Sequence, residues 1–187
     1  MNGFLSQKLN VCFSKTIRKL VGVYGKGYGE GEIVNDALKN SVYLNASDYF
    51  VKCTAKLWVE TFLDCVREWT GTFLCKGYFA DVFSFKRTRF EYIDTRFYLV
   101  SKSFYSKYLA SAYLNVGGER GLSLEHCFRD VILENKFSKI LFNMPPVIYG
   151  VGGGTGTHYK NNLKRKIKES IRLRIVRHNR SFNSLFE

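Results

Sequence analysis

The residues whose types and spacing point most clearly to chemistry are the lysines and arginines near the C-terminal end. Residues 160–180 contain nine Lys or Arg and a single acid, Glu169. Apolar residues recur here every four positions, the spacing that places them on one face of a helix: Leu163, Ile167, Ile171 and Ile175. We expect this stripe to pack against the protein and the cationic faces to meet solvent. Because like charges on one helix repel each other, such faces indicate a polyanionic partner, and nucleic acid is the leading candidate.

Residue types that support catalysis are present, but their spacing argues against an active site. His126, His158 and His178 share no metal-ligand spacing. The nearest cluster is Glu125, His126 and Cys127, and adjacent residues on a helix point about 100° apart, so these side chains do not converge. The acids form no recognisable general acid and base pair. The sequence therefore predicts a binding protein with no metal, no cofactor and no catalytic residue, rather than an enzyme.

A second basic cluster follows a stretch rich in Thr, Phe, Tyr and Val. Residues 70–85 lack helical periodicity and have Lys76 and Gly77 near their middle, which predicts a β-hairpin. Its far end runs into basic residues interleaved with aromatic ones: Phe85, Lys86, Arg87, Arg89 and Phe90. Such interleaving suits phosphate contacts combined with stacking on unpaired bases, although aromatic residues on a hairpin also pack in cores.

Helical periodicity predicts the elements that must position these residues. Helices are expected at residues 5–24, 30–43, 50–66, 94–115 and 124–135, with the basic helix at the C-terminal end. Residues 139–149 read as a strand interrupted by Pro145 and Pro146. The expected fold is mainly α: a bundle of about six helices with a protruding β-hairpin at approximately residues 70–85, in a single domain of residues 1–187.

Two glycine-rich stretches are similar to phosphate-binding loops without matching them. Residues 25–31 (GKGYGEG) fit neither G-x-G-x-x-G nor G-x-x-x-x-G-K-S/T, and no Lys-Ser/Thr follows residues 150–159. We interpret the first as a turn between helices and the second as a linker into the basic helix.

Composition agrees with a basic binding protein. The net charge of +13 and the pI near 9.6 point to RNA, DNA or an anionic membrane surface. The five cysteines are widely spaced and never form C-x-x-C, so neither a disulfide framework nor a zinc ribbon is indicated. No run is long and apolar enough for a transmembrane helix. The acid-free residues 1–29 read either as a mitochondrial transit peptide or as the first helix of the mature protein, and we expect the second.

Several local strings, in chain order, resemble one protein family. Residues 20–38 are similar to a Gly-Lys-Lys turn and an Ile-Val-x-x-Ala-Leu helix, residues 122–127 (LSLEHC) to an Ile-Ser-Leu-Glu-Lys-Cys run, and residues 179–182 (NRSF) to a tail after a basic helix. The family with these strings is the seventh of the universal small-subunit ribosomal proteins, in its mitochondrial or bacterial form. Gly27 replaces a second lysine, and residues 136–159 have no counterpart and look like an insertion. These departures suit a divergent mitochondrial member.

The resemblance implies a function and a set of partners. The protein would be a structural constituent of the mitochondrial small subunit that binds the 3′ major domain of the rRNA and organises assembly of the head. It would contact neighbouring small-subunit proteins, and its hairpin would approach the mRNA and the exit-site tRNA, with no membrane contact. The candidate RNA-binding residues are Lys8, Lys15, Arg18, Lys19, Lys26, Lys76, Lys86, Arg87, Arg89, Arg96, Lys160, Lys164, Arg165, Lys166, Lys168, Arg172, Arg174, Arg177 and Arg180.

One alternative from another class stays open. A basic accessory subunit of a mitochondrial inner-membrane complex would use the same cationic faces to contact anionic lipid. Such a subunit should carry a spanning segment or a broad exposed apolar face, and the sequence indicates neither. A nucleic-acid enzyme is the weakest alternative.

Overall fold

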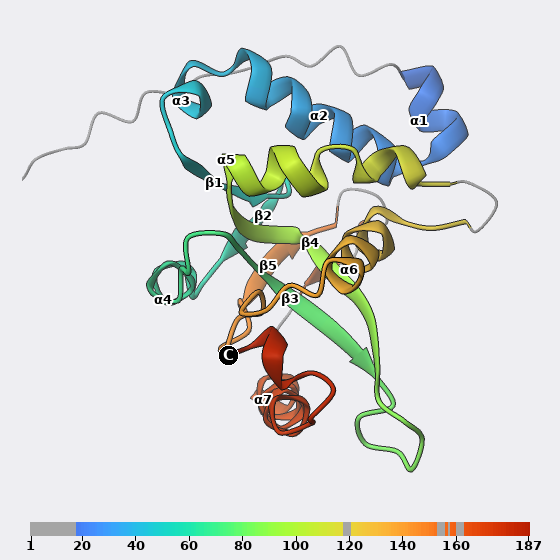
Figure 1. The fold of residues 1–187 in the computed structure, drawn as a ribbon, viewed down its shortest axis with the longest axis vertical. Coiled ribbons are helices and arrows are strands. Elements are labelled where there is room, and N and C mark those ends of the chain that lie inside the picture. The colour runs from blue at the N-terminus through green and yellow to red at the C-terminus, as the bar shows by residue number, and fades with distance from the viewer. Residues whose placement is uncertain (1–17, 118–120, 153–155, 157, 160–162) are drawn as a thin grey trace, which may run out of the picture.

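The computed structural model describes residues 18–117, 121–152, 156, 158–159 and 163–187 (Figure 1). These residues form a mixed α/β fold with two three-stranded antiparallel sheets. The predicted mainly α bundle of about six helices is therefore wrong. The prediction failed because the strands at residues 73–80 and 89–101 are largely buried on both faces, so their sequences do not alternate between apolar and polar residues.

The larger sheet has the strand order β1-β4-β3 and contains the hairpin. It consists of β1 (Tyr49–Cys53), β3 (Phe73–Ala80) and β4 (Arg89–Ser101). The register of β3 and β4 runs from Phe73 opposite Val100 to Ala80 opposite Arg89, with two irregularities. The turn of the hairpin is thus at residues 81–88, and Lys76 and Gly77 lie inside β3 rather than at the turn.

The smaller sheet, ordered β2-β5-β6, joins distant parts of the chain. It consists of β2 (Leu57–Val59), β5 (Ile148–Val151) and β6 (His158–Tyr159). Residues 140–142, just upstream of β5, are almost fully buried, and Phe142 donates a backbone hydrogen bond to Cys75 at 2.9 Å. Much of the segment that looked like an insertion at residues 136–159 therefore belongs to the core.

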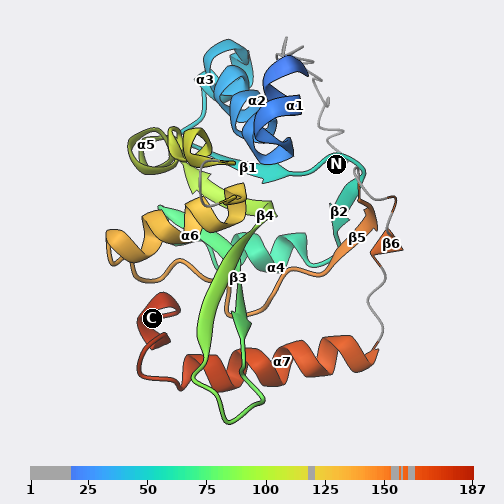
Figure 2. The ribbon, with the colours of Figure 1, turned by 90° about the vertical axis from the view of Figure 1, so that its right-hand side faces the viewer.

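Helices lie at both ends of the larger sheet. At one end are α1 (Arg18–Tyr24), α2 (Lys26–Asn40) and α3 (Val42–Asn45), next to α5 (Lys102–Phe104), the π-helical η1 (Tyr105–Leu109) and the 3-10 helix η2 (Ala112–Asn115). The helices α4 (Phe62–Arg67) and α6 (Leu124–Glu134) flank the sheet. At the other end, α7 (Leu163–Arg177) runs across the hairpin (Figure 2), followed by the 3-10 helix η3 (Asn183–Leu185).

Two predicted helices and one predicted turn need correction. Residues 50–66 form β1, β2 and α4, and residues 94–115 form most of β4 followed by α5, η1 and η2. The stretch 25–31, predicted to be a turn, contains the first two turns of α2. Gly31 is required there because a Cβ at this position would lie only 2.2 Å from Cβ of Tyr113, so only glycine lets α2 approach η2 this closely. Residues 5–17 of the first predicted helix lie outside the described residues, and α1 is its remainder.

The prediction of α6 and α7 is confirmed. The predicted helix at residues 124–135 matches α6, with Ser123 as its N-cap. Among the described residues no helix combines the length and apolarity needed to cross a membrane.

The core is built on both faces of the larger sheet. On one face Phe73 packs between Phe104, with ring centroids 5.6 Å apart, and Phe128, at 6.5 Å. On the other face Leu74 and Phe97 belong to a smaller cluster with Cys65, Leu99, Phe142 and Ile148. Because successive residues of a strand point to opposite faces, β3 and β4 supply both clusters.

Residues after α7 close the core. The backbone N–H groups of Ile140 and Leu141 both donate to the carbonyl of Leu185 at 2.9 Å, and Lys139 donates to Ser184. The side chains of Leu185 and Phe186 are buried, and Phe182 packs edge-on against Phe79 of β3 at 5.1 Å. The chain that follows α7 is therefore joined both to β3 and to residues 139–141.

Candidate nucleic-acid interface

The hairpin tip, residues 81–88, projects beyond α7 (Figures 1 and 2). Local bonds shape the turn: Ser84 N–H donates to the carbonyl of Asp81, and Lys86 N–H donates to Oγ of Ser84 at 3.2 Å. Phe85 is fully exposed, Phe83 is half-exposed, and Lys86 and Arg87 are exposed. An exposed phenylalanine forgoes roughly 2–3 kcal/mol of burial, so a tip of this composition is suited to a partner that covers the ring.

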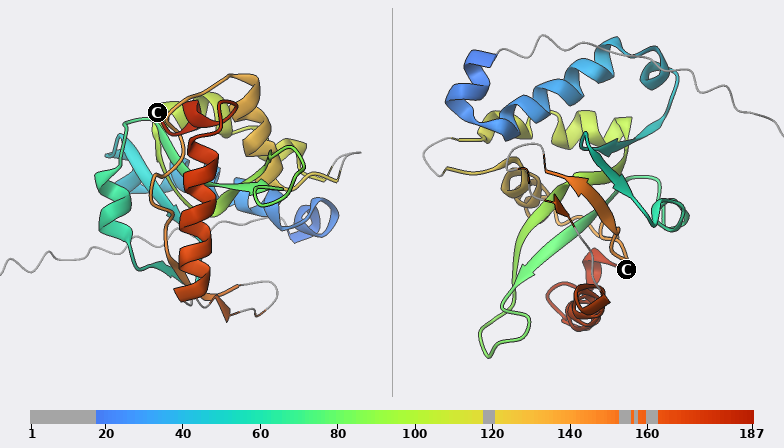
Figure 3. Two further views of the ribbon diagram at one scale, coloured as in Figure 1. Left: turned by 90° about the horizontal axis from the view of Figure 1, so that it is seen from below. Right: turned by 180° about the vertical axis from the view of Figure 1, so that it is seen from behind.

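The helix α7 is attached to the hairpin through its one acid. Oε2 of Glu169 lies 3.4 Å from Nζ of Lys76 on β3, and its other oxygen accepts from Arg172. The Nζ of Lys168 and the guanidinium of Arg172 lie 5.7 and 5.6 Å from the ring centre of Phe83. Both distances fall within the range for cation–π attraction. The hairpin tip and α7 thus form one surface; Figure 3 shows the backbone of both elements from below.

Several predicted RNA-binding residues form ion pairs with acidic residues of the protein itself. Lys76 pairs with Glu169, Arg89 with Asp81 at 3.2 Å, and Lys166 with Glu60 at 3.1 Å. Arg96 pairs with Asp94 at 2.6 Å, and Arg172 pairs with Glu169. Lys76 and Lys166 join α7 to other segments, whereas the other three cations pair within the hairpin or within α7. The charges of all five are at least partly neutralised inside the molecule.

Two pKa shifts follow from these pairs. The hydrogen bond to Glu60 raises the pKa of Lys166. Burial lowers the pKa of Arg96, but the hydrogen bonds that its guanidinium donates to Asp94 outweigh burial and hold the pKa above its ordinary value. Both side chains therefore stay charged at neutral pH, and both already have an anionic partner.

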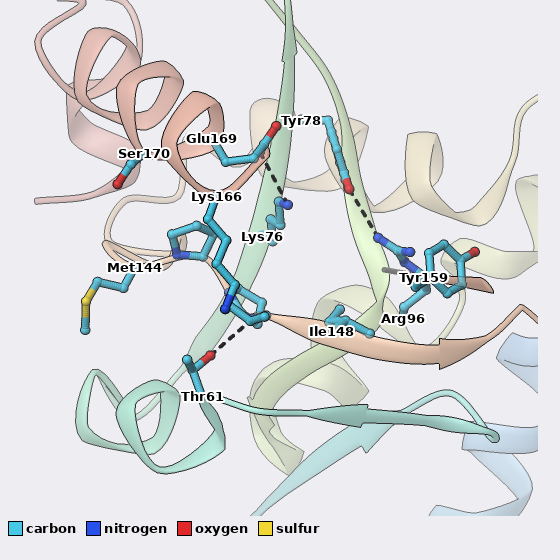
Figure 4. A pocket seen from close by; sticks show the side chains of 13 residues that line it. Thr61, Lys76, Tyr78, Arg96, Met144, Ile148, Tyr159, Lys166, Glu169 and Ser170 are labelled. Atoms are coloured by element: carbon cyan, nitrogen blue, oxygen red, sulfur yellow. Dashed lines mark hydrogen bonds and ion pairs between the residues drawn. The ribbon is translucent and has the colours of Figure 1, made fainter. Parts of the chain in front are cut away.

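A cavity of about 220 Å³ lies where the hairpin, α7 and residues 144–148 meet (Figure 4). The Arg96 guanidinium donates to the hydroxyl of Tyr78 at 3.1 Å and lies 4.6 Å from the ring centre of Tyr159. The hydroxyl of Thr61 accepts from the backbone N–H of Val147. Lys76, Arg96 and Lys166 in the wall of this cavity all form ion pairs with acidic residues of the protein. We therefore interpret the cavity as part of the contact between α7 and the sheet, rather than as a binding site.

The remaining predicted cations of this surface form no ion pair within the described part of the chain. Lys86 and Arg87 belong to the hairpin tip, Lys168 and Arg174 are exposed on α7, and Arg180 is exposed just after it. Lys164 and Arg177 are the other two on α7, the second only half-exposed. We call the hairpin tip and these α7-region cations the basic surface. Its charges are available to an external polyanion.

The apolar stripe of α7 does not pack as the sequence predicted. Ile167, Ile171 and Ile175 are 51%, 49% and 42% exposed, whereas Val176 is fully buried. The buried face of α7 is the one that carries Glu169, because Lys76 and the residues after α7 hold that side against β3. The i,i+4 spacing identifies an apolar stripe on the helix, but it does not predict which face of the helix packs against the core.

The structure does not bring the predicted N-terminal cations to this surface. Lys26 is exposed at the start of α2, and Arg18 and Lys19 belong to α1, at the opposite end of the molecule from α7 (Figure 1). Lys8, Lys15 and Lys160 lie outside the described residues. Arg165 is part of α7, but the placement of its side chain is not described.

Three contributors to the surface were missed in the sequence. Phe83 bridges the tip and α7, Phe182 ties the following segment to β3, and Glu169 anchors the helix. Only Glu169 had a signal, since a single acid in a basic helix is a candidate for an internal ion pair. Phe90, which the sequence grouped with the basic cluster, is buried and stacks on Phe79 at 4.9 Å.

Residues of the Glu125, His126 and Cys127 cluster have other partners. His126 shares a hydrogen bond with Oγ of Ser123 at 2.8 Å, and Glu125 accepts from Thr95. Burial raises the pKa of the Cys127 thiol, which disfavours the reactive thiolate. Within the described ranges no three His, Cys, Asp or Glu side chains are grouped so as to hold a metal ion.

The sequence and the fold were compared with known proteins. No protein-family model matches the chain, and neither the curated proteins nor the solved structures contain a match.

Proposed function

We propose that the protein binds RNA through the basic surface. The observation that carries the proposal is the hairpin tip, where a fully exposed Phe85 stands beside Lys86 and Arg87, two cations without an ion pair among the described residues. Phenylalanine stacks on unpaired bases, while lysine and arginine contact phosphates on either side of them. The cations of α7 extend the phosphate-binding track beyond the tip.

Unpaired RNA suits this surface better than a regular duplex. A ring at the end of a narrow turn can stack only on a base that is already out of a helix, and loops and bulges of RNA supply such bases. A duplex would engage the cations but leave Phe85 without a partner.

For the particular RNA we propose the head domain of mitochondrial small-subunit rRNA, which makes the protein a structural constituent of that subunit. This part is supported only by the local strings at residues 20–38, 122–127 and 179–182. It has no support from the fold, because the bundle that the family resemblance implies is absent. Sedimentation of a mitochondrial extract tests it: the protein should travel with small subunits, and migration with free protein or with membranes would contradict the assignment.

The RNA-binding proposal is tested with the full chain and a labelled RNA stem-loop. Replacing Lys86 and Arg87 together with Ala should weaken binding and make the slope of log affinity against log salt shallower by about 1.4 to 1.8, because each phosphate contact contributes about 0.7 to 0.9. Phe85→Ala should weaken stem-loop binding by roughly tenfold, since stacking on one base is worth about 1–3 kcal/mol, and should leave the salt slope unchanged.

The matched control removes the same charge at the far end of the molecule. Lys39 on α2 and Lys107 on η1 are both exposed, so the Lys39→Ala, Lys107→Ala double variant should bind the stem-loop nearly as well as the unchanged protein. If the control loses as much affinity as the tip variant, binding is a general effect of net charge and the proposed site is wrong.

A further inference from the structure

RNA binding leaves the exposed isoleucines of α7 unexplained. Ile167, Ile171 and Ile175 are each exposed by about half on the outward face of the helix. Aliphatic side chains form no hydrogen bond or ion pair with phosphate, so contact with RNA gives no reason to keep three of them in water. The face has the properties of an interaction surface of its own.

A groove lies beside this face, between α7 and residues 143–145. Its volume is about 500 Å³, and apolar lining comes from Met144, Pro145, Ile171 and Leu173. Met144 is 58% exposed. A flexible methionine beside an exposed isoleucine is a common composition for a surface that accepts a partner's apolar side chain.

The charged side chains that line the groove are cationic, while the nearby Glu68 is engaged by the backbone N–H groups of Asn143 and Met144. Arg174 and Arg177 line it, Lys164 and Lys168 flank the isoleucines on α7, and no Asp or Glu is among the groove's described lining residues. An apolar centre with a polar rim is the usual anatomy of a protein–protein interface. Here the rim is cationic, so the complementary partner has an acidic rim around an apolar centre.

We propose that the isoleucine face and its groove dock an acidic amphipathic segment of another protein. The segment has apolar side chains along one side, which cover Ile171 and enter the groove beside Met144, and Asp or Glu on both flanks, which pair with the arginines and lysines. This is the helix-in-groove mode of recognition. The inference goes beyond RNA binding, and the segment would share four cations with the basic surface, namely Lys164, Lys168, Arg174 and Arg177.

Two other occupants fit less well. A second copy of the chain would bring two cationic faces together, and like charges in an interface oppose association. The affinity of a helix for an anionic membrane rises with the apolar area that it buries. The face between Ile167 and Ile175 is only about 12 Å long at 1.5 Å per residue, which is much shorter than the apolar face of most membrane-surface helices.

The test uses the full-length protein and a synthetic helical peptide with leucines along one side and glutamates on both flanks, with a control peptide of the same composition in which the leucines are scattered. We expect the first peptide to bind and the scattered one to bind about tenfold more weakly, which corresponds to a difference of about 1.4 kcal/mol. Ile171→Ser should lower affinity for the first peptide by about tenfold or more. Equal binding of the two peptides would overturn the proposal, because it would show a purely electrostatic attraction.

Two variants serve as controls. Val23, which is 68% exposed on α1, has the same aliphatic character at the opposite end, so Val23→Ser should leave peptide binding unchanged. The Lys86→Ala, Arg87→Ala variant should also bind the peptide normally while binding the RNA stem-loop more weakly. This separation distinguishes failure of the docking proposal from failure of the RNA-binding proposal.

Three further outcomes would assign the face to a different occupant and reject the proposal. A loss of stem-loop RNA binding in Ile171→Ser as large as that of the tip variant would make the face part of the RNA site. Cosedimentation with phosphatidylglycerol vesicles that is lost in Ile171→Ser would make it a lipid contact. Dimerisation in sedimentation equilibrium that disappears in the same variant would make it a contact between copies.

Discussion

The two ends of the β3–β4 hairpin contain similar residues in opposite surroundings. Phe73 at the root is fully buried, whereas Phe85 at the tip is fully exposed. Lys76 within β3 is paired with Glu169, whereas Lys86 in the tip has no ion pair among the described residues. The root is covered by α6 and by the helices after β4, but the tip projects past α7. The root is therefore part of the core and the tip is open to a partner because other elements of the fold bury the root and leave the tip exposed.

The sharpest way to examine this difference is to truncate one phenylalanine at each end. Phe73→Ala should lower the free energy of unfolding by about 3–5 kcal/mol, because it removes a ring packed between Phe104 and Phe128 and leaves a cavity. Phe85→Ala should change it by no more than about 0.5 kcal/mol. Chemical denaturation measures both, and a large loss in Phe85→Ala would mean that the tip is covered within the folded chain.

A second comparison concerns the two lysines. Glu169→Gln leaves Lys76 and Arg172 without their anionic partner in a half-buried position, and we expect a loss of about 1–2 kcal/mol in the free energy of unfolding. Lys86→Gln should be nearly neutral in the same measurement and should act only on RNA affinity. An equal effect of the two substitutions would show that the contact between Glu169 and Lys76 does not anchor α7.

The smallest expected effect compares a buried cysteine with an exposed one as the pH rises. Burial raises the pKa of the Cys65 thiol from 9.0 to about 11. The folded state therefore keeps a proton that the unfolded state releases, so this contribution to stability is complete below pH 9 and is lost as the pH approaches 11. With allowance for solvent screening the loss is on the order of 1 kcal/mol.

The free energy of unfolding, measured by denaturation between pH 8 and 11 for the unchanged protein and two variants, tests this expectation. Cys65→Ala should flatten the decline, and Cys53→Ala, on the exposed edge strand β1, should flatten it less. If the two variants have the same profile as the unchanged protein, the alkaline loss of stability comes from other groups.

The sequence located the parts whose signals are local. α6 has a capping serine and a regular apolar period, and α7 has an isoleucine every fourth residue, so both were predicted as helices, and the bounds of α6 agree within about two residues. Lys86 and Arg87 were recognised because a cluster of cations beside aromatic residues needs no knowledge of the fold. These features depend on neighbours in the chain alone.

The features that were missed depend on distant contacts. In β4, Phe97 to Val100 are all buried because helices and other segments cover both faces of the strand, and spacings of three and four residues among Phe97, Val100 and Phe104 imitated a helix. Gly31 signals a turn locally, but it lies within α2, where the absence of a side chain makes room for Tyr113. The orientation of α7 likewise follows from Lys76, which is 93 residues before Glu169 in the chain.

The hydrogen bonds from Ile140 and Leu141 to Leu185 have a consequence for the order of events during synthesis. Residues 140–141 are made well before residues 184–185, so a nascent chain carries an open edge beside β3 for as long as the intervening segment takes to be translated. An unpaired edge next to an apolar core is a template for pairing with another chain. The protein should therefore be most prone to aggregation in the interval before residues 184–185 dock, when this edge is still open.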